Sequence, residues 1–320
     1  MQSFPISLYL YIVKTMRHLL LLALFCCAVV IHAETYAVII SGGRNKMFNH
    51  ERYWNDCAFL YRTLRQEYHI SKDHIFLLMA DGDNPANDML CDDATGFASS
   101  PTDLDVDGQS DLTLAATRKN LDDTFYQLSS LLTANDHIFI FITDHGERDA
   151  YGSVHLWLWG NEQLSPNELS TIIGQCHPST MNILLGQCHA GAFIAPLQAD
   201  GRVIIAACAA DQMSWACKDK AYDEFVYHWT CAIARHDETG QPIDADSDGN
   251  GLISMDEAFS YACQHDCRPE TPTLTSQPSD LSARWSFSGV EEKVGITQTF
   301  TLFPSTSTLF DLQGRKIKND

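Results

Sequence analysis

Basic residues are scarce in this chain of 320 residues, where 21 Lys and Arg stand against 41 Asp and Glu and give a formal net charge of −20. Nucleic acids and anionic membrane surfaces are bound through clustered Lys and Arg side chains. We therefore expect no nucleic-acid partner. The 45% of hydrophobic residues can fill a core, so the composition also excludes a disordered chain.

Apolar runs long enough to cross a bilayer are missing as well. The longest, 19–31, has 13 residues, whereas a membrane-spanning helix needs about 20. It follows the basic Arg17 and ends near Ala33, which is typical of a cleaved signal peptide. We predict a signal peptide over residues 1–33, with Met16 as the true start and 1–15 upstream of it. The protein would be exported to the periplasm, cell surface or medium, without a transmembrane anchor after cleavage.

No two cysteines have the C-x2-C spacing that indicates zinc. Nine cysteines follow residue 33, and an exported chain meets an oxidising compartment, so we expect some disulfides. The odd number leaves at least one free thiol. The spacing does not assign the pairs.

Short apolar segments alternate with segments of helical periodicity. This pattern predicts an α/β fold with a mostly parallel sheet and helices on both faces. Strands are expected at 36–41, 75–79, 139–143, 154–159, 181–185 and 203–207, and helices at 54–67, 114–132, from Ser165 onward, and at 223–234.

Two of these strands end at reactive side chains. The segment 139–146 (FIFITDHG) leads to His145, and 182–191 (NILLGQCHAG) leads to Cys188. Parallel strands gather their ligands at their carboxyl ends. The pattern therefore predicts a cysteine nucleophile, Cys188, with His145 as its base. His189, the neighbour of the nucleophile, is the less favoured base.

The T-D-H-G and C-x-x-G motifs together resemble the caspase-like cysteine peptidases, and most closely the legumain (C13) family. The resemblance covers roughly residues 36–267 and implies a three-layer αβα sandwich over 34–267. It also implies that Gly146 donates its N–H to the oxyanion and that Asn49 orients His145. The role of Asp144 stays open.

The positions that line the substrate pocket in legumain-like enzymes differ here. Where the family has an arginine and a glutamate, this chain has Glu51 and Gly186. Ser214 and Asp223 match a pocket serine and aspartate. Two carboxylates, from Glu51 and Asp223, would favour Arg or Lys before the scissile bond.

A calcium loop is predicted over residues 246–257, which fit D-x-[DN]-x-[DN]-G-x5-E. The expected ligands of a structural calcium ion are Asp246, Asp248, Asn250, the backbone carbonyl of Leu252 and Glu257. A second loop starts similarly but has Leu114 where the closing glutamate belongs. It lies in a predicted acidic insertion, 81–113, and could hold calcium partially or be a polar loop; its candidate ligands are Asp103, Asp105, Asp107 and Asp111.

Residues 268–320 are predicted to be a linker followed by a short β segment. The end of the chain, 307–318, resembles the C-terminal sorting segments of secreted Bacteroidetes proteins, although a plain β-hairpin fits equally well.

We therefore expect a secreted cysteine endopeptidase that acts on peptides or proteins through an acyl-enzyme. Two alternatives remain. The first is a transpeptidase or ligase that uses the same dyad, and the second is a non-catalytic, calcium-stabilised surface-binding protein.

Overall fold

A six-stranded sheet forms the centre of the computed structural model, which describes residues 33–91, 96–219 and 221–290. The strand order is β11-β10-β9-β5-β1-β2, and every pairing is parallel except β10 with β11. The strands are β1 (Thr35–Ser41), β2 (Ile75–Met79), β5 (His137–Thr143), β9 (Thr180–Leu185), β10 (Arg202–Ala206) and β11 (Thr273–Gln277). The predicted signal peptide and the end of the chain lie outside the described residues.

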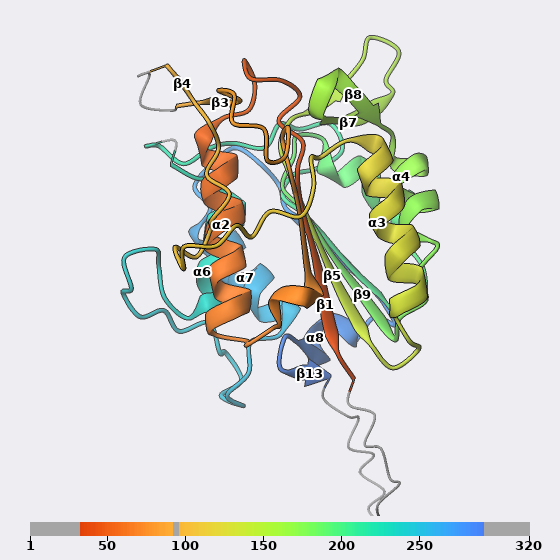
Figure 1. Ribbon diagram of the computed structural model, residues 1–320. Helices are drawn as coiled ribbons and strands as arrows, with labels where there is room; N and C mark the ends of the chain where they lie inside the picture. The colour runs from red at the N-terminus through yellow and green to blue at the C-terminus, as the bar shows by residue number, and fades with distance from the viewer. Residues whose placement is uncertain (1–32, 92–95, 220, 291–320) are drawn as a thin grey trace, which may run out of the picture. The chain divides into compact units, whose positions relative to one another are not determined.

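Helices cover both faces of this sheet (Figure 1). One face carries α2 (Glu51–Gln66), α6 (Glu224–Ala234) and α7 (Met255–His265), and the other carries α3 (Arg118–Leu131), α4 (Pro166–Ile173) and α5 (Ile194–Leu197). Successive strand residues feed opposite layers, so Ile39 packs in one core cluster and Ile40 in the other. The predicted three-layer αβα sandwich is confirmed.

Helix α4 begins at the expected position, and a complete capping box marks its N-terminus. The Ser165 side chain accepts the N–H of Glu168, and Glu168 accepts in return from Ser165, with a proline at the first helical position. Ser254 and Glu257 form the same capping box at the start of α7. Helix α2 begins at Glu51, before the predicted start at residue 54.

Smaller elements surround the carboxyl edge of the sheet. After β5 the chain forms a three-stranded antiparallel sheet, β6 (Gly146–Arg148), β7 (Val154–Leu158) and β8 (Glu162–Leu164). The acidic insertion contains β3 (Met89–Leu90) and β4 (Phe97–Ala98), and its Leu104 is fully buried, so part of it belongs to the core. The remaining elements are η1 (Lys72–His74), η2 (Trp159–Asn161), η3 (Ala190–Phe193), α8 (Leu281–Arg284), β12 (Trp285–Ser286) and β13 (Gly289–Val290).

The segment after Cys267 differs from the predicted linker. Strand β11 pairs antiparallel with β10 and completes one edge of the central sheet. Trp285 is fully buried in the core beside α6 and α7. The compact unit therefore extends to Val290. The polar, Pro- and Thr-rich composition fits an edge strand because only one side of it needs a partner.

The nine cysteines after residue 33 are all free thiols, in contrast to the expected disulfides. In the described part of the chain, no helix is long and apolar enough to cross a membrane.

Candidate active site

The ends of β5 and β9 lie side by side at the carboxyl edge of the sheet. The two strands pair in register from His137 with Thr180 to Ile142 with Leu185. Directly after the paired region, the N–H of Gly186 donates to the Ile142 carbonyl at 2.8 Å. His145 follows one strand and Cys188 the other, so the sheet brings both residues to the same edge.

Left-handed backbone accompanies both reactive residues. Asp144, just before His145, has φ 137°, and His189, just after Cys188, has φ 60°. Non-glycine residues adopt such conformations at a cost of about 1–3 kcal/mol. At Asp144 this strained backbone ends β5 with a sharp turn, and at His189 it leads from Cys188 into the short helix η3. The Asp144 side chain is buried and accepts the N–H of His145, which holds the turn.

Gly146 lies close to the backbone of the nucleophile. An added Cβ atom at Gly146 would be 1.9 Å from the carbonyl oxygen of Cys188. Gly146 faces Leu156 in the ladder with β7, and the flanking bond runs from the Trp157 N–H to the His145 carbonyl. In this antiparallel pattern Gly146 occupies a non-hydrogen-bonded pair, so its N–H points away from β7. That N–H is available to an oxyanion.

The Cys188 side chain is 9% exposed, and its thiol donates to the Ser214 carbonyl at 3.6 Å. Burial raises the pKa of this thiol, and the Asp223 carboxylate raises it further. The Cys188 thiol is therefore protonated and is held by the loop of residues 209–223, here called the pocket loop.

The His145 ring is held from the side of α2. Its Nε2 lies 3.0 Å from the Phe48 carbonyl, and the Tyr53 hydroxyl lies 3.3 Å from the same nitrogen. Burial lowers the pKa of His145 to about 4, with a further contribution from the Arg52 charge. The ring is thus neutral at physiological pH. In the resting state, neither ring nitrogen is bonded to the Cys188 thiol, which has the Ser214 carbonyl as its acceptor.

Asn49 is buried near the histidine but contacts other groups. Its side-chain amide donates to the Asp88 carbonyl at 3.0 Å, and its own carbonyl accepts the N–H of Leu90. In this segment it is the carbonyl of the preceding residue, Phe48, that contacts the His145 ring. Asn49 therefore fixes the backbone that carries Phe48, and its direct orienting role stays a prediction.

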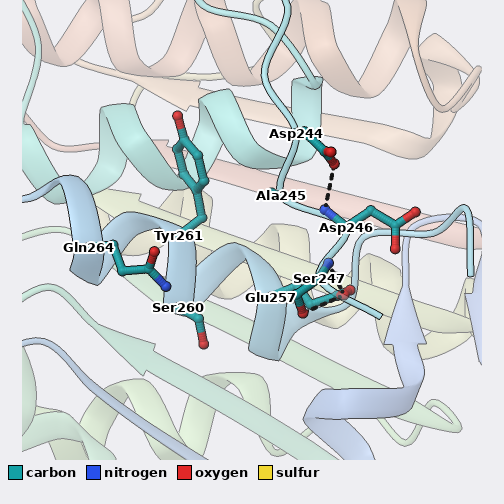
Figure 2. Close-up of a pocket in the computed structure, with 8 residues that line it drawn as sticks. All are labelled: Asp244, Ala245, Asp246, Ser247, Glu257, Ser260, Tyr261 and Gln264. Atoms are coloured by element: carbon teal, nitrogen blue, oxygen red, sulfur yellow. Dashed lines mark hydrogen bonds between the residues drawn. The ribbon is translucent and has the colours of Figure 1, made fainter. Parts of the chain in front are cut away.

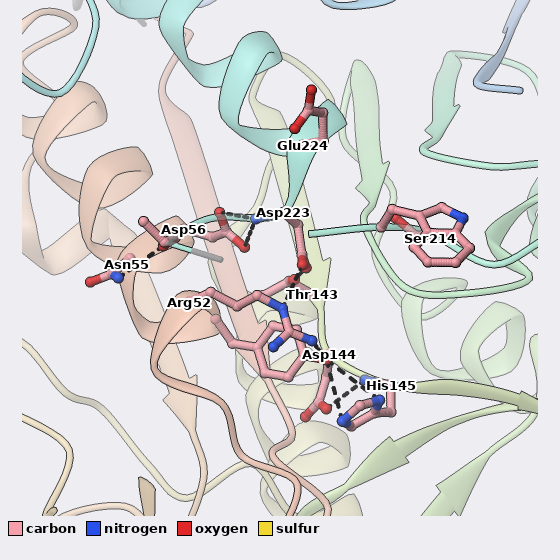
Figure 3. A network of polar contacts seen from close by, with 12 residues as sticks. Arg52, Asn55, Asp56, Thr143, Asp144, His145, Ser214, Asp223 and Glu224 are labelled. Carbon is pink, nitrogen blue, oxygen red and sulfur yellow. Dashed lines mark hydrogen bonds and ion pairs between the residues drawn. The ribbon is translucent and has the colours of Figure 1, made fainter. Parts of the chain in front are cut away.

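Asp223 forms a buried ion pair with Arg52 beside the dyad (Figure 3). The Arg52 Nε lies 2.9 Å from the Asp223 carboxylate, and the other carboxylate oxygen accepts from the Thr143 hydroxyl at 3.2 Å. Arg52 also donates to the Tyr53 hydroxyl at 2.9 Å. A chain of polar contacts thus runs from Asp223 through Arg52 and Tyr53 to His145.

Sequence reasoning did not select Arg52 or Tyr53. The signal for Arg52 was its place directly after Glu51, the position at which the family pattern has its arginine. Arg52, one position later on the first turn of α2, reaches the buried Asp223. Tyr53 carried no signal, because an apolar ring at helical spacing is usually a core residue.

The other predicted pocket residues have different surroundings. Glu51 is the first residue of α2 and is half-buried. At Gly186, an added Cβ atom would be 2.8 Å from a methyl group of Val226 on α6. The space that a side chain at this position would need is therefore filled by Val226. Ser214 presents its carbonyl to Cys188.

Figure 2 shows Asp246 of the predicted calcium loop and Glu257, which lies in the first turn of α7. Single oxygens of Asp246, Asp248 and Glu257 all lie within 4.8 Å of one another. Asp246 accepts the N–H groups of Gly249 and Gly251 at 2.8 Å, which wraps the loop around this cluster. An adjoining cavity of about 270 Å³ is lined by Asp244, Ala245, Asp246, Ser247, Glu257, Ser260, Tyr261 and Gln264.

The second acidic loop already contains a cation of the protein itself. Asp103, Asp105 and Asp111 cluster there, but the Lys72 ammonium lies 2.7 Å from the buried Asp111 carboxylate. Asp111 also accepts from the Tyr61 hydroxyl at 2.8 Å and from the Leu104 N–H at 2.7 Å. The Lys72 ammonium already supplies the positive charge at this carboxylate, which favours the polar-loop alternative.

Comparison with known proteins supports the chemistry that this geometry indicates. Residues 35–245 match the model of the peptidase C13 family, which is well over half of the chain. A comparison with curated proteins finds no match. A peptidase acts on a peptide or protein substrate. The chain therefore belongs to the peptidase C13 family and is a cysteine peptidase of the legumain kind.

Proposed function

We propose that this protein is an exported cysteine endopeptidase in which Cys188 is the nucleophile and His145 the general base and acid. The observation that carries the proposal is the meeting of β5 and β9, which places His145, Gly146 and Cys188 at one edge of the sheet. Membership of the C13 family supports the same chemistry. Export rests on the signal-peptide pattern of residues 16–33.

The reaction starts from a neutral thiol and a neutral imidazole. A bound substrate must draw the Cys188 thiol away from the Ser214 carbonyl and the His145 ring away from the Phe48 carbonyl. His145 then takes the thiol proton while the sulfur attacks the scissile carbonyl. The same proton passes to the leaving amine, and water hydrolyses the acyl-enzyme.

The oxyanion of the tetrahedral intermediate would be stabilised by backbone N–H groups. Gly146 offers an N–H outside the β6–β7 ladder, next to the backbone of Cys188. Backbone donors that are fixed before the reaction contribute more than donors that must reorient. The N–H of Cys188 is the second proposed donor.

The residue preferred before the scissile bond is proposed from the ion pair in Figure 3. A preference for Arg or Lys required free carboxylates at Glu51 and Asp223, but Arg52 already neutralises Asp223. The pair presents guanidinium donors and carboxylate acceptors together. Such a site suits a side-chain carboxamide better than a cation, so we expect Asn to be preferred over Arg and Lys.

A calcium ion is proposed in the loop 246–257. The donor set consists of carboxylate and carbonyl oxygens, which suit a hard cation, and three carboxylates within 4.8 Å repel one another without one. Asp246, Asp248, Asn250, the Leu252 carbonyl and Glu257 would hold the ion. Its role would be structural, because the loop leads into α7, whose Met255 and Ala258 are fully buried.

Activity-based labelling tests this function. Acyloxymethyl-ketone probes with Asn, Asp, Arg or Lys at the reactive position are incubated with the wild type, Cys188→Ala and Cys176→Ala, since Cys176 is buried under α3 and serves as the cysteine control. Labelling of the wild type and Cys176→Ala but not of Cys188→Ala supports the proposal. Labelling that survives in Cys188→Ala, or no labelling of the wild type, contradicts it. Capture of the acyl-enzyme by an added amine would favour a transpeptidase.

A further inference from the structure

One peptide group lies between Cys188 and Glu270. The carbonyl of Ser214 accepts the Cys188 thiol at 3.6 Å, and the N–H of the next residue, Trp215, donates to a Glu270 carboxyl oxygen at 3.0 Å. In a trans peptide, the C=O and N–H bonds point in opposite directions from one rigid plane. A contact that fixes the N–H therefore also fixes the direction of the carbonyl.

Thr271, the residue after Glu270, holds the pocket loop at a second point. The N–H of Thr271 donates to the Gln212 side-chain oxygen at 2.8 Å, and the Gln212 amide donates to the Thr271 hydroxyl at 3.1 Å. Glu270 and Thr271 lie beyond residues 35–245, the part that matches the family. The contacts that hold the pocket loop are thus made by residues for which the family match gives no role.

The other edge of the loop is tied to the start of α6. The carbonyl of Trp215 accepts the N–H of Glu224 at 2.9 Å, and the backbone N–H of Cys217 donates to the Tyr222 carbonyl at 2.8 Å. Trp215 is therefore held on both sides, by α6 and by Glu270. The Ser214 carbonyl, which belongs to the same peptide group as the Trp215 N–H, has no freedom to turn away from Cys188 while both contacts persist.

We infer that Glu270 is a positioning residue for the nucleophile: by anchoring the Trp215 N–H, it aims the Ser214 carbonyl at the Cys188 thiol and keeps the wall of the substrate pocket in place. This inference rests on the proposed peptidase function of Cys188. It assigns a role in the active site to a residue that follows α7.

The protonation state of Glu270 decides which substitution mimics it best. Burial raises the pKa of Glu270 to about 9, and the neighbouring Asp266 carboxylate contributes further. Arg268 and Glu224 interact with Asp266, and the thiols of Cys188 and Cys208 interact with Glu270. At neutral pH Glu270 thus carries its proton, and glutamine is a close mimic that keeps an oxygen acceptor for Trp215 but does not ionise.

The experiment compares Glu270→Ala and Glu270→Gln with the control Asp211→Ala, which removes an exposed carboxylate from the same loop. Two quantities are measured: kcat and KM on the best peptide substrate, and the rate of alkylation of Cys188 by iodoacetamide between pH 6 and 10, mapped by mass spectrometry. We expect kcat/KM of Glu270→Ala to fall at least tenfold, with Glu270→Gln and Asp211→Ala within about threefold of the wild type.

Alkylation gives a readout that does not depend on turnover. Glu270 ionises near pH 9, and its charge then raises the pKa of Cys188, so the alkylation midpoint of Glu270→Gln should lie at lower pH than that of the wild type. If Glu270→Ala does not fold, Glu270→Asp, whose shorter side chain withdraws the acceptor oxygen from the Trp215 N–H, replaces it in the comparison of kcat and KM. Equal midpoints, or a Glu270→Ala enzyme as active as Asp211→Ala, overturn the inference. A wild type without turnover whose midpoint still shifts in Glu270→Gln would refute the proposed function and leave the positioning contact standing.

Discussion

Gly146 and Cys188 approach so closely that the position of a Cβ atom on Gly146 would be 1.9 Å from the Cys188 carbonyl oxygen. The two residues come from neighbouring turns, one after β5 and one after β9. The absence of a side chain at residue 146 therefore allows the two backbones to form one surface. If both N–H groups bind the oxyanion, this contact sets the geometry of the site.

Gly146→Ala should therefore abolish activity. The added methyl must displace backbone, and overpacking of this kind costs about 1–3 kcal/mol of folding free energy. We expect kcat/KM to fall at least 100-fold, the size of effect seen when an oxyanion donor is lost. Peptide hydrolysis and thermal unfolding measure both effects, with Arg148→Ala, an exposed position on the same strand, as the control. An active Gly146→Ala enzyme would contradict the assigned donor.

The acid limb of activity should lie well below the usual range of histidine. The base must be neutral, and burial together with Arg52 lowers the pKa of His145 to about 4. Since kcat/KM reports the free enzyme, its acid midpoint should lie near pH 4 rather than near 6.5. Arg52→Gln removes a positive charge and should move the midpoint to higher pH. Lys119→Gln, which removes an exposed lysine from α3, should leave it unchanged. A wild-type midpoint near 6.5 would contradict the assignment.

The positions of His145 and Cys188 could be predicted because strand ends carry a strong local signal. The seven residues His137 to Thr143 are all buried in the sheet, the five between His137 and Thr143 are apolar, and the polar residues Asp144 and His145 follow directly. Parallel pairing then places both strand ends at one edge, whatever the details of packing. The start of α4 at Ser165 was equally local, because the partners of its capping box are three residues apart.

The contacts around these residues could not be predicted in the same way. Arg52 and Asp223 are 171 positions apart, and their pairing depends on how α2 and α6 lie on the sheet. Strand β11 was missed because its polar, half-buried composition resembles a linker, and only its partner β10 makes it a strand. The Lys72 contact with Asp111 likewise converts an apparent calcium ligand into an internal ion pair.

Asp111 should contribute to stability through Lys72 and not through calcium. Burial alone would raise the pKa of Asp111, but hydrogen bonds from Lys72, Leu104 and Tyr61 hold it below its ordinary value. The carboxylate is therefore stabilising above its unfolded pKa, near 4, and this contribution is lost as the pH falls through the lower folded pKa.

Asp111→Ala leaves a buried N–H and a hydroxyl without acceptors, which should cost about 2–4 kcal/mol of unfolding free energy at pH 7. Urea unfolding at pH 7 and at decreasing pH measures this, with Asp123→Ala, an exposed partner of Lys119, as the control. The difference between the wild type and Asp111→Ala should shrink in acid. If the loss of unfolding free energy in Asp111→Ala vanished when calcium was chelated, the second loop would be a calcium site instead.

Calcium should raise the stability of the wild type through the loop 246–257 alone. An ion that binds only the folded state stabilises it by about 2.7 kcal/mol at a concentration 100 times its Kd. Helix α7 starts inside the loop, and its Met255 is fully buried in the core, so loss of the ion should loosen a core helix and not only a surface turn.

Thermal unfolding with calcium and with a chelator measures the shift. Glu257→Gln should abolish the response to calcium, because it removes the negative charge that closes the loop, whereas Asp105→Asn in the second loop should keep it. Since Glu257 also caps α7 through Ser254, the two variants are compared by their response to calcium and not by their absolute stability. If the unfolding temperature of the wild type were the same with calcium and with chelator, the proposed calcium site would be wrong.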